Sequence, residues 1–170
     1  MNKDNVILIG MPGCGKSTIG VVLAKTMGYD FLDSDIVIQK VKNATLEQLI
    51  EEHGTDGFNE IENEVNSNLD IHKTVLATGG SVVYGKEAMN HLKEIGTIVF
   101  IKLDCDEIAS RLGDFKKRGI SIKEGQTLLD LFNERKPLYE KYADVVVDTT
   151  GLDIKGAMAK IKASVEKEYK

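Results

Sequence analysis

Residues 10–17 read GMPGCGKS and directly follow the apolar run VILI of residues 6–9. This order of strand, glycine-rich loop, lysine and hydroxyl is typical of a phosphate-binding loop (P-loop). Its three glycines let the backbone curl so that successive N–H groups point inward at phosphate oxygens. Lys16 adds a point charge on the outer phosphates, and the Ser17 hydroxyl can bind Mg²⁺. Because residues 17–27 have a helical pattern, the loop is predicted to hold a nucleoside triphosphate at a helix N-terminus.

The composition is that of an ordinary globular domain. Of the 170 residues, 42% are hydrophobic and 29% are charged, which suits a soluble domain with a full core. The net charge of −5 argues against a general affinity for nucleic acid or for an anionic membrane, and no apolar run approaches the roughly 20 residues of a membrane span. The chain enters its first predicted strand too early for a signal peptide, and its two cysteines form no disulfide framework. We therefore expect one cytoplasmic domain over residues 1–170, acting as a monomer.

Segments with the character of strands alternate with helical segments along the whole chain. The predicted strands are residues 6–9, 29–32, 74–77, 97–103 and 145–147. The predicted helices are residues 17–27, 36–41, 46–52, 58–69, 87–95, 106–112, 127–142 and 153–169. Thr45 and Gln48 have the spacing of a capping box, Gly54 is expected to end a helix, and Pro137 is expected to distort or break one. Strands separated by helices predict an α/β fold with a parallel sheet covered on both faces and ligands bound beyond the carboxyl ends of its strands.

The loops after the second and third predicted strands carry residues suited to substrate chemistry. Asp33 and Asp35 follow the second strand. Two carboxylates one residue apart can divide two tasks, one holding Mg²⁺ and the other accepting a hydroxyl proton or holding a substrate hydroxyl. The alternative is that one of them only caps the following helix. Gly79 and Gly80 follow the third strand, where they either allow close approach of a ligand to the backbone or form an ordinary turn.

Residues 113–126 are rich in charge and glycine and poor in large apolar side chains, which is typical of a mobile flap. The flap contains Lys116, Lys117 and Arg118. A cation that closes over a moving phosphoryl group lowers the barrier to its transfer; the alternative is a solvated run of charge. Arg135, in the helix after the flap, is either a bidentate ligand for an anionic substrate or a surface arginine.

These motifs together resemble the shikimate kinase family, within the nucleoside-monophosphate-kinase group of P-loop proteins. The resemblance runs essentially end to end and rests on residues 10–18, the turn 32–35, Phe58 with Glu62, the Gly79-Gly80 loop, Arg118 and residues 135–139. It implies a three-layer fold, a five-stranded parallel sheet in the order 2-3-1-4-5 between helices. It also implies a mobile lid at about residues 113–126 and substrate-binding helices at about residues 36–69. The implied reaction is transfer of the γ-phosphoryl group of ATP, with Mg²⁺, to the 3-hydroxyl of shikimate.

The resemblance also implies roles for individual residues of this chain. The implied catalytic residues are Lys16, Asp35 and Arg118. The implied ATP-binding residues, with Arg111 against the adenine, are Gly13, Cys14, Gly15, Lys16, Ser17, Thr18, Arg111 and Arg118. The implied ligands of Mg²⁺ are Ser17 and Asp33. The implied acceptor-binding residues are Asp35, Asn59, Gly79, Gly80 and Arg135.

The acceptor half of the chain departs from the family pattern. The family carries an arginine that grips the shikimate carboxylate directly after the residue matching Phe58, where this chain has Asn59. Loss of a charge-assisted hydrogen bond of about 1.5–3 kcal/mol weakens affinity roughly 10- to 100-fold. Ser81 replaces a third glycine in the Gly79-Gly80 loop, which we call the substrate loop. The flap reads Arg118-Gly119 where the family has Arg-Pro. Two alternatives therefore stay open: a kinase for another hydroxylated metabolite, and a nucleotide-binding regulatory protein without catalysis.

Overall fold

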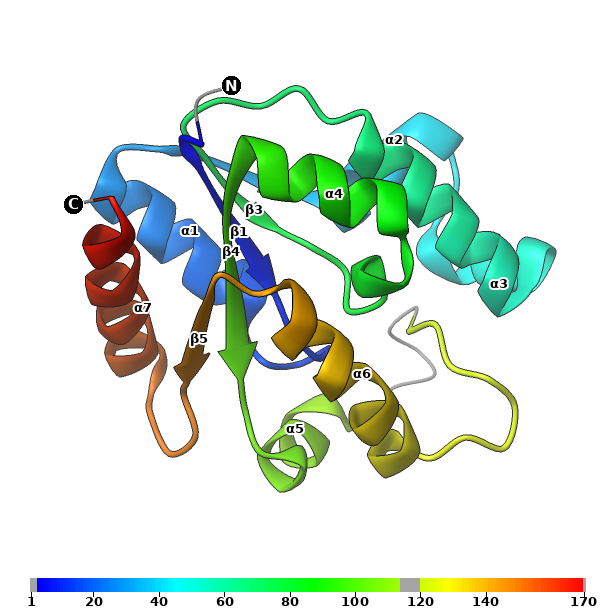
Figure 1. Cartoon of the computed structure of the whole chain (residues 1–170). Helices are drawn as coiled ribbons and strands as arrows, with labels where there is room; N and C mark the ends of the chain where they lie inside the picture. The colour runs from blue at the N-terminus through cyan, green and yellow to red at the C-terminus, as the bar shows by residue number, and fades with distance from the viewer. Residues whose placement is uncertain (1–2, 114–119, 170) are drawn as a thin grey trace.

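The computed structural model describes residues 3–113 and 120–169. Its centre is a sheet of five parallel strands in the order β2-β3-β1-β4-β5 (Figure 1). The strands are β1 (Asn5–Ile9), β2 (Asp30–Asp33), β3 (Thr74–Ala77), β4 (Gly96–Lys102) and β5 (Val145–Asp148). This is the order that the sequence resemblance implied, so the expected fold is confirmed.

The first strand lies in the middle of the sheet, where both of its faces are covered. All five residues of β1 are buried, as expected of an apolar strand between two helical layers. Its one polar residue, Asn5, donates hydrogen bonds to the carbonyl oxygens of Ile71 and Ile95 at 3.0 and 2.8 Å. These bonds tie the chain entering β3 and β4 to the start of β1. The loop after β1 therefore leaves the sheet at its centre, beside the ends of both neighbouring strands.

Seven α-helices and one short 3₁₀-helix lie between or after the strands within the described ranges. They are α1 (Lys16–Met27), α2 (Ser34–Lys42), α3 (Leu46–Ser67), η1 (Val82–Tyr84), α4 (Lys86–Ile95), α5 (Cys105–Leu112), α6 (Leu128–Tyr142) and α7 (Ile154–Glu168). Helices α1 and α7 pack together on one face of the sheet, and α4 and α6 lie on the other face (Figure 1). The sheet is thus the middle of three layers.

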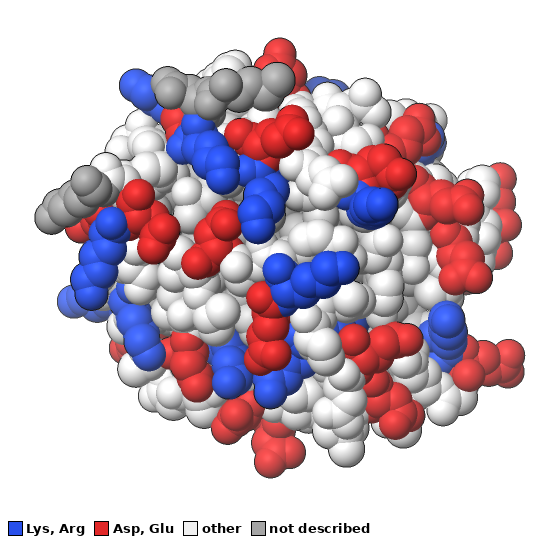
Figure 2. Space-filling view, in the orientation of Figure 1, with Lys and Arg blue, Asp and Glu red and all other residues white. Residues whose placement is uncertain are grey.

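Two surface properties bear on the expected partners. In the part of the chain that the structure describes, no helix combines the length and the apolar composition that crossing a membrane requires. On the face seen in Figure 1, acidic and basic side chains are interspersed (Figure 2). The described residues of this face therefore form no continuous basic stripe of the kind that follows a nucleic-acid backbone.

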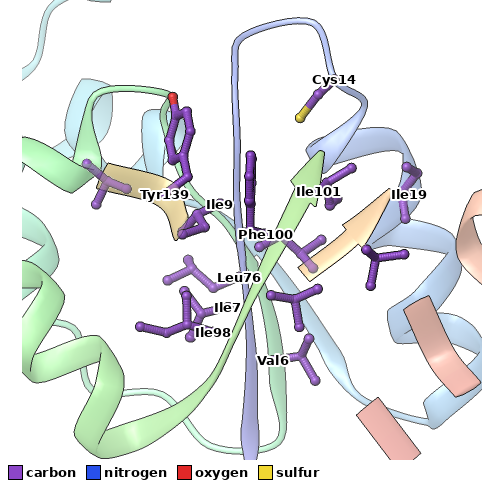
Figure 3. Close-up of a cluster of buried hydrophobic side chains, with 14 of the residues drawn as sticks. Val6, Ile7, Ile9, Cys14, Ile19, Leu76, Ile98, Phe100, Ile101 and Tyr139 are labelled. Carbon is purple, nitrogen blue, oxygen red and sulfur yellow. The ribbon is translucent and has the colours of Figure 1, made fainter. Parts of the chain in front are cut away.

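The main core lies between the sheet and both helical layers. Ile19 of α1 and Tyr139 of α6 lie on opposite sides of the central strands (Figure 3). The rings of Tyr139 and Phe100, in β4, stack with their centroids 5.1 Å apart. A second, smaller cluster joins α2 to α3 through Ile38, Leu49, Phe58 and Val65. Burial of one such side chain contributes about 1.5–3 kcal/mol, so this cluster fixes the two helices that border the site.

The helical run that begins α3 stops at Gly54, as expected, and α3 kinks there. Gly54 has φ 71° and ψ 179°, a conformation that practically only glycine adopts. The chain returns to helix directly after it, so the two predicted helices form one element with a bend. At the start of α3, Thr45 and Gln48 form the expected capping box.

Helix α6 continues through Pro137, so of the distortion or break expected there the break does not occur. A proline removes one backbone hydrogen bond, and the buried side chains of Leu131 and Tyr139 hold the helix against the core on either side of it. The expected flap overlaps residues 114–119, which lie outside the described residues. Its following part does contribute to the interior, since Ser121 is buried and Ile120 packs against the core.

Candidate active site

The loops after β1, β2 and β3 border one cavity at the carboxyl ends of the strands, where parallel sheets bind their ligands. This central cavity has a volume of about 310 Å³. It brings together most of the residues that the sequence singled out: Gly13, Gly15, Lys16, Ser17, Thr18, Asp35, Gly79, Gly80 and Arg135. Motifs that are 60 or more positions apart in the sequence thus meet at one edge of the sheet.

The P-loop has the backbone geometry of an anion site. Gly13 and Gly15 have φ values of 80° and 97°, which favour glycine. A Cβ atom at Gly13 would also lie 2.9 Å from the Leu112 side chain. Gly15 is the N-cap of α1, and the first turn of α1 contains no acidic residue. The free N–H groups and the positive end of the helix dipole are therefore available to phosphate.

Lys16 adds a positive charge to this loop. Its side chain is buried, and its Nζ donates hydrogen bonds to the carbonyl oxygens of Gly10 and Met11 at 2.7 and 2.9 Å. Both partners are neutral oxygens, so they orient the ammonium across the loop without cancelling its charge. The charge remains available to an anion bound at the start of α1.

Ser17 and Asp33 join the P-loop to the end of β2. The Ser17 hydroxyl donates to Asp33 Oδ2 at 2.6 Å, and Asp33 Oδ1 accepts from the backbone N–H of Asp35 at 2.9 Å. Asp33 is therefore the N-cap of α2 and also faces the P-loop hydroxyl. Capping of the helix and binding of Mg²⁺ are thus compatible roles for this residue. A hydroxyl and a carboxylate oxygen at this separation are the ligand types that Mg²⁺ prefers, and these residues fit that ion.

Asp35 lines the central cavity from the first turn of α2. Burial raises the pKa of Asp35 to about 6, with a further rise from the Asp33 carboxylate and an opposing effect of Lys16. Such a carboxylate is ionised at neutral pH and more basic than an ordinary aspartate, which suits it to accept a hydroxyl proton. A Cβ atom at Gly79 would collide with Asp35 Oδ1 and with Glu62 Oε2. Glycine at this position therefore lets both carboxyl groups reach the substrate loop.

Arg135 is a buried cation at the same cavity, only 1% exposed. Its Nη2 donates to the carbonyl oxygen of Ser121 at 2.6 Å, and its Nε donates to the Tyr84 hydroxyl at 3.4 Å. The guanidinium also lies over the Tyr84 ring, 5.3 Å from the centroid. These neutral partners orient the guanidinium, and no carboxylate of the described residues lies within ion-pair distance of it. A buried charge without a counter-ion is costly to a fold, which marks Arg135 as a candidate ligand for an anion.

A second cavity, of about 720 Å³, lies on the other side of the P-loop. It shares Gly13, Gly15 and Thr18 with the central cavity and adds Cys14 and Arg111. The Arg111 guanidinium lies 3.4 Å from Glu107 one turn earlier on α5. This nucleotide-side cavity has the size of a small-molecule site and borders the loop that would hold the phosphates.

Comparison with known proteins identifies the family of this chain. A family model described as shikimate kinase matches residues 12–166. This chain belongs to the shikimate kinase family. The shikimate kinase of Francisella tularensis subsp. holarctica (strain OSU18) is 36% identical over 99% of this chain and 98% of its own length. The shikimate kinase of Alteromonas mediterranea is 39% identical over 86% of this chain and 88% of its own length.

Solved structures of shikimate kinases share the fold. The enzyme from Acinetobacter baumannii, in complex with shikimate, has a TM-score of 0.84 and 31% identity, covering 98% of this chain and 92% of that chain. The enzyme from Aquifex aeolicus has a TM-score of 0.79 and 29% identity, covering 97% and 98%. The sequence-based expectation of a shikimate kinase, an ATP-dependent enzyme with an alcohol acceptor, is thereby confirmed.

Besides Cys14 and Arg111 in the nucleotide-side cavity and Asp33 beside Ser17, two further predicted site residues are not among the described residues that line the central cavity. Arg118 belongs to residues 114–119, outside the described part of the chain. Asn59 borders an adjoining cavity of about 80 Å³ that shares Arg135 and Ser121 with the central one. The Asn59 side-chain oxygen accepts a hydrogen bond from the Ser121 hydroxyl at 3.2 Å.

Sequence reasoning assigned no site role to several other residues that lie in or beside these cavities. Glu62 and Ser81 line the central cavity, and Tyr84 orients the guanidinium of Arg135. The segment from Thr149 to Lys155, which leads from β5 into the first turn of α7, supplies much of the nucleotide-side cavity. The sequence did contain a signal for this segment, namely its position directly after a predicted parallel strand. The other loops of the site follow the carboxyl ends of strands in the same way. No such local signal marks Tyr84.

Proposed function

We propose that this chain transfers the γ-phosphoryl group of ATP to the 3-hydroxyl group of shikimate. The observation that carries the proposal is that the P-loop, Asp35 and Arg135 line one cavity. A phosphate site, a carboxylate base and a buried cation for a carboxylate are thus brought together, as phosphorylation of a hydroxy acid requires. The A. baumannii relative was solved in complex with shikimate, which supports the same acceptor here.

The P-loop side of the cavity would bind the triphosphate. Backbone N–H groups at the start of α1 and the ammonium of Lys16 bind phosphate oxygens and oppose the charge that builds up during transfer. Ser17 and Asp33 would hold Mg²⁺, which when bound supplies further positive charge to the phosphates. The adenosine part would occupy the nucleotide-side cavity, with Arg111 against the base.

Asp35 would act on the attacking hydroxyl. As the 3-hydroxyl oxygen forms its bond to the γ-phosphorus, the bond to the ADP oxygen breaks and Asp35 takes the hydroxyl proton. The raised pKa of Asp35, about 6, keeps it ionised at neutral pH and increases its affinity for that proton. Its position beside Gly79 allows the acceptor to approach both the carboxylate and the backbone.

Arg135 would hold the carboxylate of the acceptor. Its guanidinium is fixed by Ser121 and Tyr84 and packs beside Gly80, where a Cβ atom would lie 3.0 Å from Nη1. A planar guanidinium held in this way is preorganised for a bidentate bond to a carboxylate. Acceptor binding by Asn59 and closure of Arg118 over the phosphates stay predictions.

The setting of the reaction is also part of the proposal. We infer one kinase domain over residues 1–170, with the lid at about residues 113–126 and the substrate helices at about residues 36–69. We further infer a monomer in the cytoplasm that acts on small molecules and not on nucleic acid or membranes. The net charge of −5 supports this inference.

A coupled assay of ADP release tests the proposed function. The purified protein is given ATP and Mg²⁺ with shikimate or with a panel of polyols and hydroxy acids, and the Lys16→Ala protein serves as the control. We expect ADP release that depends on shikimate and is absent from the control. The hydrogen bond between Asn59 and Ser121 favours a second candidate, a kinase for another hydroxylated metabolite. Release with a panel member and not with shikimate would establish that candidate instead.

A further inference from the structure

A buried glutamate in the central cavity has no part in the reaction described above. Glu62 is 1% exposed and lines the cavity from α3. Its Oε1 accepts a hydrogen bond from the Ser81 hydroxyl at 2.5 Å, whereas its Oε2 is buried without a hydrogen-bond partner in the described residues. An ionised carboxylate at such depth normally has a cation or several donors around it. One neutral donor and one unpartnered oxygen do not meet that need.

The helix position that would supply a cation to Glu62 holds an amide instead. Residue 59 is three positions earlier on α3, one turn away on the same side, where side chains interact with residue 62. Asn59 carries no charge, and its oxygen accepts a hydrogen bond from Ser121, in the described part of the expected lid segment. Within the described ranges, no lysine or arginine nitrogen lies within 4.0 Å of the Glu62 carboxyl. Glu62 therefore has no ion pair there.

The groups that face Glu62 come from four parts of the fold. Ser81 belongs to the loop after β3, Asp35 to α2, Arg135 to α6 and Lys16 to the P-loop end of α1. The two cations bind neutral oxygens of their own. Burial is the main cause that raises the pKa of Glu62 to about 7; the Ser81 hydroxyl lowers it, Asp35 raises it, and Arg135 and Lys16 lower it.

We propose that Glu62 carries its proton when the anionic acceptor binds, and that Ser81 fixes the orientation of this neutral carboxyl. The inference rests on the proposed function and deepens it, because it states how the acceptor site keeps its attraction for a carboxylate. An ionised Glu62 would offset the charge of Arg135 in a surrounding of low dielectric constant. An arginine at position 59 beside an ionised Glu62 gives the same net charge as Asn59 beside a protonated Glu62. In this chain a proton thus takes the electrostatic place of a guanidinium.

Steady-state kinetics between pH 6 and pH 9, at saturating ATP and Mg²⁺, test this inference. We expect the wild-type KM for shikimate to be constant up to about pH 7 and then to rise, on the order of tenfold by pH 9, as Glu62 ionises. Glu62→Gln keeps a neutral group of the same shape at every pH, so its KM should stay level and fall below that of the wild type above about pH 8. Glu60→Gln, which changes an exposed carboxyl of the same helix, should follow the wild type. A level wild-type KM, or a Glu62→Gln KM above that of the wild type at every pH, overturns the proposal.

Carbon-13 NMR of the Glu62 carboxyl in the free protein decides the same point without turnover, with the signal assigned from its loss in Glu62→Gln. We expect a titration midpoint near pH 7. The midpoint should move to lower pH in Asn59→Arg, where a cation favours the ionised form, and to higher pH in Ser81→Ala, which removes a donor to that form. A wild-type midpoint near the ordinary glutamate value of about 4.3 overturns the proposal. If shikimate is phosphorylated at no pH, the proposed function fails, whereas this titration still decides whether Glu62 is protonated.

Discussion

The hydroxyl of Tyr139 donates a hydrogen bond of 2.5 Å to the carbonyl oxygen of Gly80 and so ties α6 to the substrate loop. Tyr139 is fully buried, and its ring is held by stacking on Phe100. Arg135 lies four residues earlier, on the same side of α6. One helix therefore supplies both the cation that we propose for the acceptor and the anchor for the loop against which the acceptor is expected to lie.

Replacing Tyr139 by Phe tests the importance of this anchor. The partly buried carbonyl of Gly80 would lose its donor, and a buried group left unsatisfied costs up to about 1–3 kcal/mol. We expect the free energy of unfolding in urea to fall by about 1–2 kcal/mol and the KM for shikimate to rise several-fold, with the KM for ATP unchanged. The control is Tyr142→Phe, since the Tyr142 hydroxyl has no hydrogen bond to the described residues. Equal changes in both KM values would show a general loosening of the fold instead.

Lys16→Ala should remove turnover while leaving the fold intact. The substitution deletes the ammonium that the carbonyl groups of Gly10 and Met11 hold across the P-loop. We expect kcat to fall on the order of 10³-fold, because a preorganised charge at the transferring group contributes several kcal/mol. Lys25→Ala, an exposed lysine near the end of the same helix, should have wild-type kinetics. An active Lys16→Ala protein with a normal circular dichroism spectrum would contradict the assignment of the P-loop.

Asp35→Asn should separate chemistry from nucleotide binding. If Asp35 accepts the hydroxyl proton, kcat falls about 10²- to 10⁴-fold, while calorimetry finds the affinity for ATP with Mg²⁺ little changed. The wild-type kcat should also decline as the pH falls through about 6, because Asp35 then becomes protonated. A parallel loss of kcat and of ATP affinity would instead assign Asp35 a structural role.

The same substitution should make the protein more stable at neutral pH. The pKa of Asp35 is about 6 in the fold and 3.8 in an unfolded chain, so between these values the native state binds more protons than the unfolded state. Stability from this group is therefore full below about pH 4 and falls as the pH rises through about 6. The Asp35→Asn protein has no titrating carboxyl at this position, so its stability does not fall in this way as the pH rises. Its midpoint of urea unfolding should exceed that of the wild type at pH 7.5 and approach it near pH 4, and the opposite order would refute the assigned shift.

Local patterns predicted the strand ends of the site, and packing determined the rest. The P-loop and the Asp33-to-Asp35 turn were visible because each is a short motif directly after an apolar strand. The capping box at Thr45 was visible for the same reason, since its two partners are three residues apart. The parallel sheet followed from the alternation of strands and helices, because parallel strands need a helix between them, whereas the strand order was implied only by the family resemblance.

The contacts that set the acceptor side join residues far apart in the sequence. Ser81 and Glu62 are separated by 19 positions, and Ser121 and Asn59 by 62. No hydrophobic periodicity in the sequence indicates such pairs, because they depend on how α3 and α6 pack around the substrate loop. For a related reason Pro137, which was expected to distort or break its helix, does not break it. A local propensity was outweighed by the buried side chains that hold α6 in place.

The kink at Gly54 offers a last test of how α3 positions the acceptor side. Its φ of 71° and ψ of 179° lie in a region where other residues are strained by about 1–3 kcal/mol. A Cβ atom there would have no neighbour within 4 Å, so Gly54→Ala adds backbone strain and no collision. We expect the free energy of unfolding to fall by about 1–3 kcal/mol. Relief of the strain should shift the following turns of α3, so that the KM for shikimate rises and the KM for ATP does not.

Gly28→Ala is the matched control for this prediction. Gly28 ends α1 with φ 69° and ψ 33°, and a Cβ atom there also has no neighbour within 4 Å. An alanine in this left-handed conformation costs on the order of 1 kcal/mol, but the position is remote from α3. Gly28→Ala should therefore lower stability without a change in either KM. If both variants lose stability and neither alters the KM for shikimate, the bend at Gly54 serves folding alone and does not set the position of Glu62.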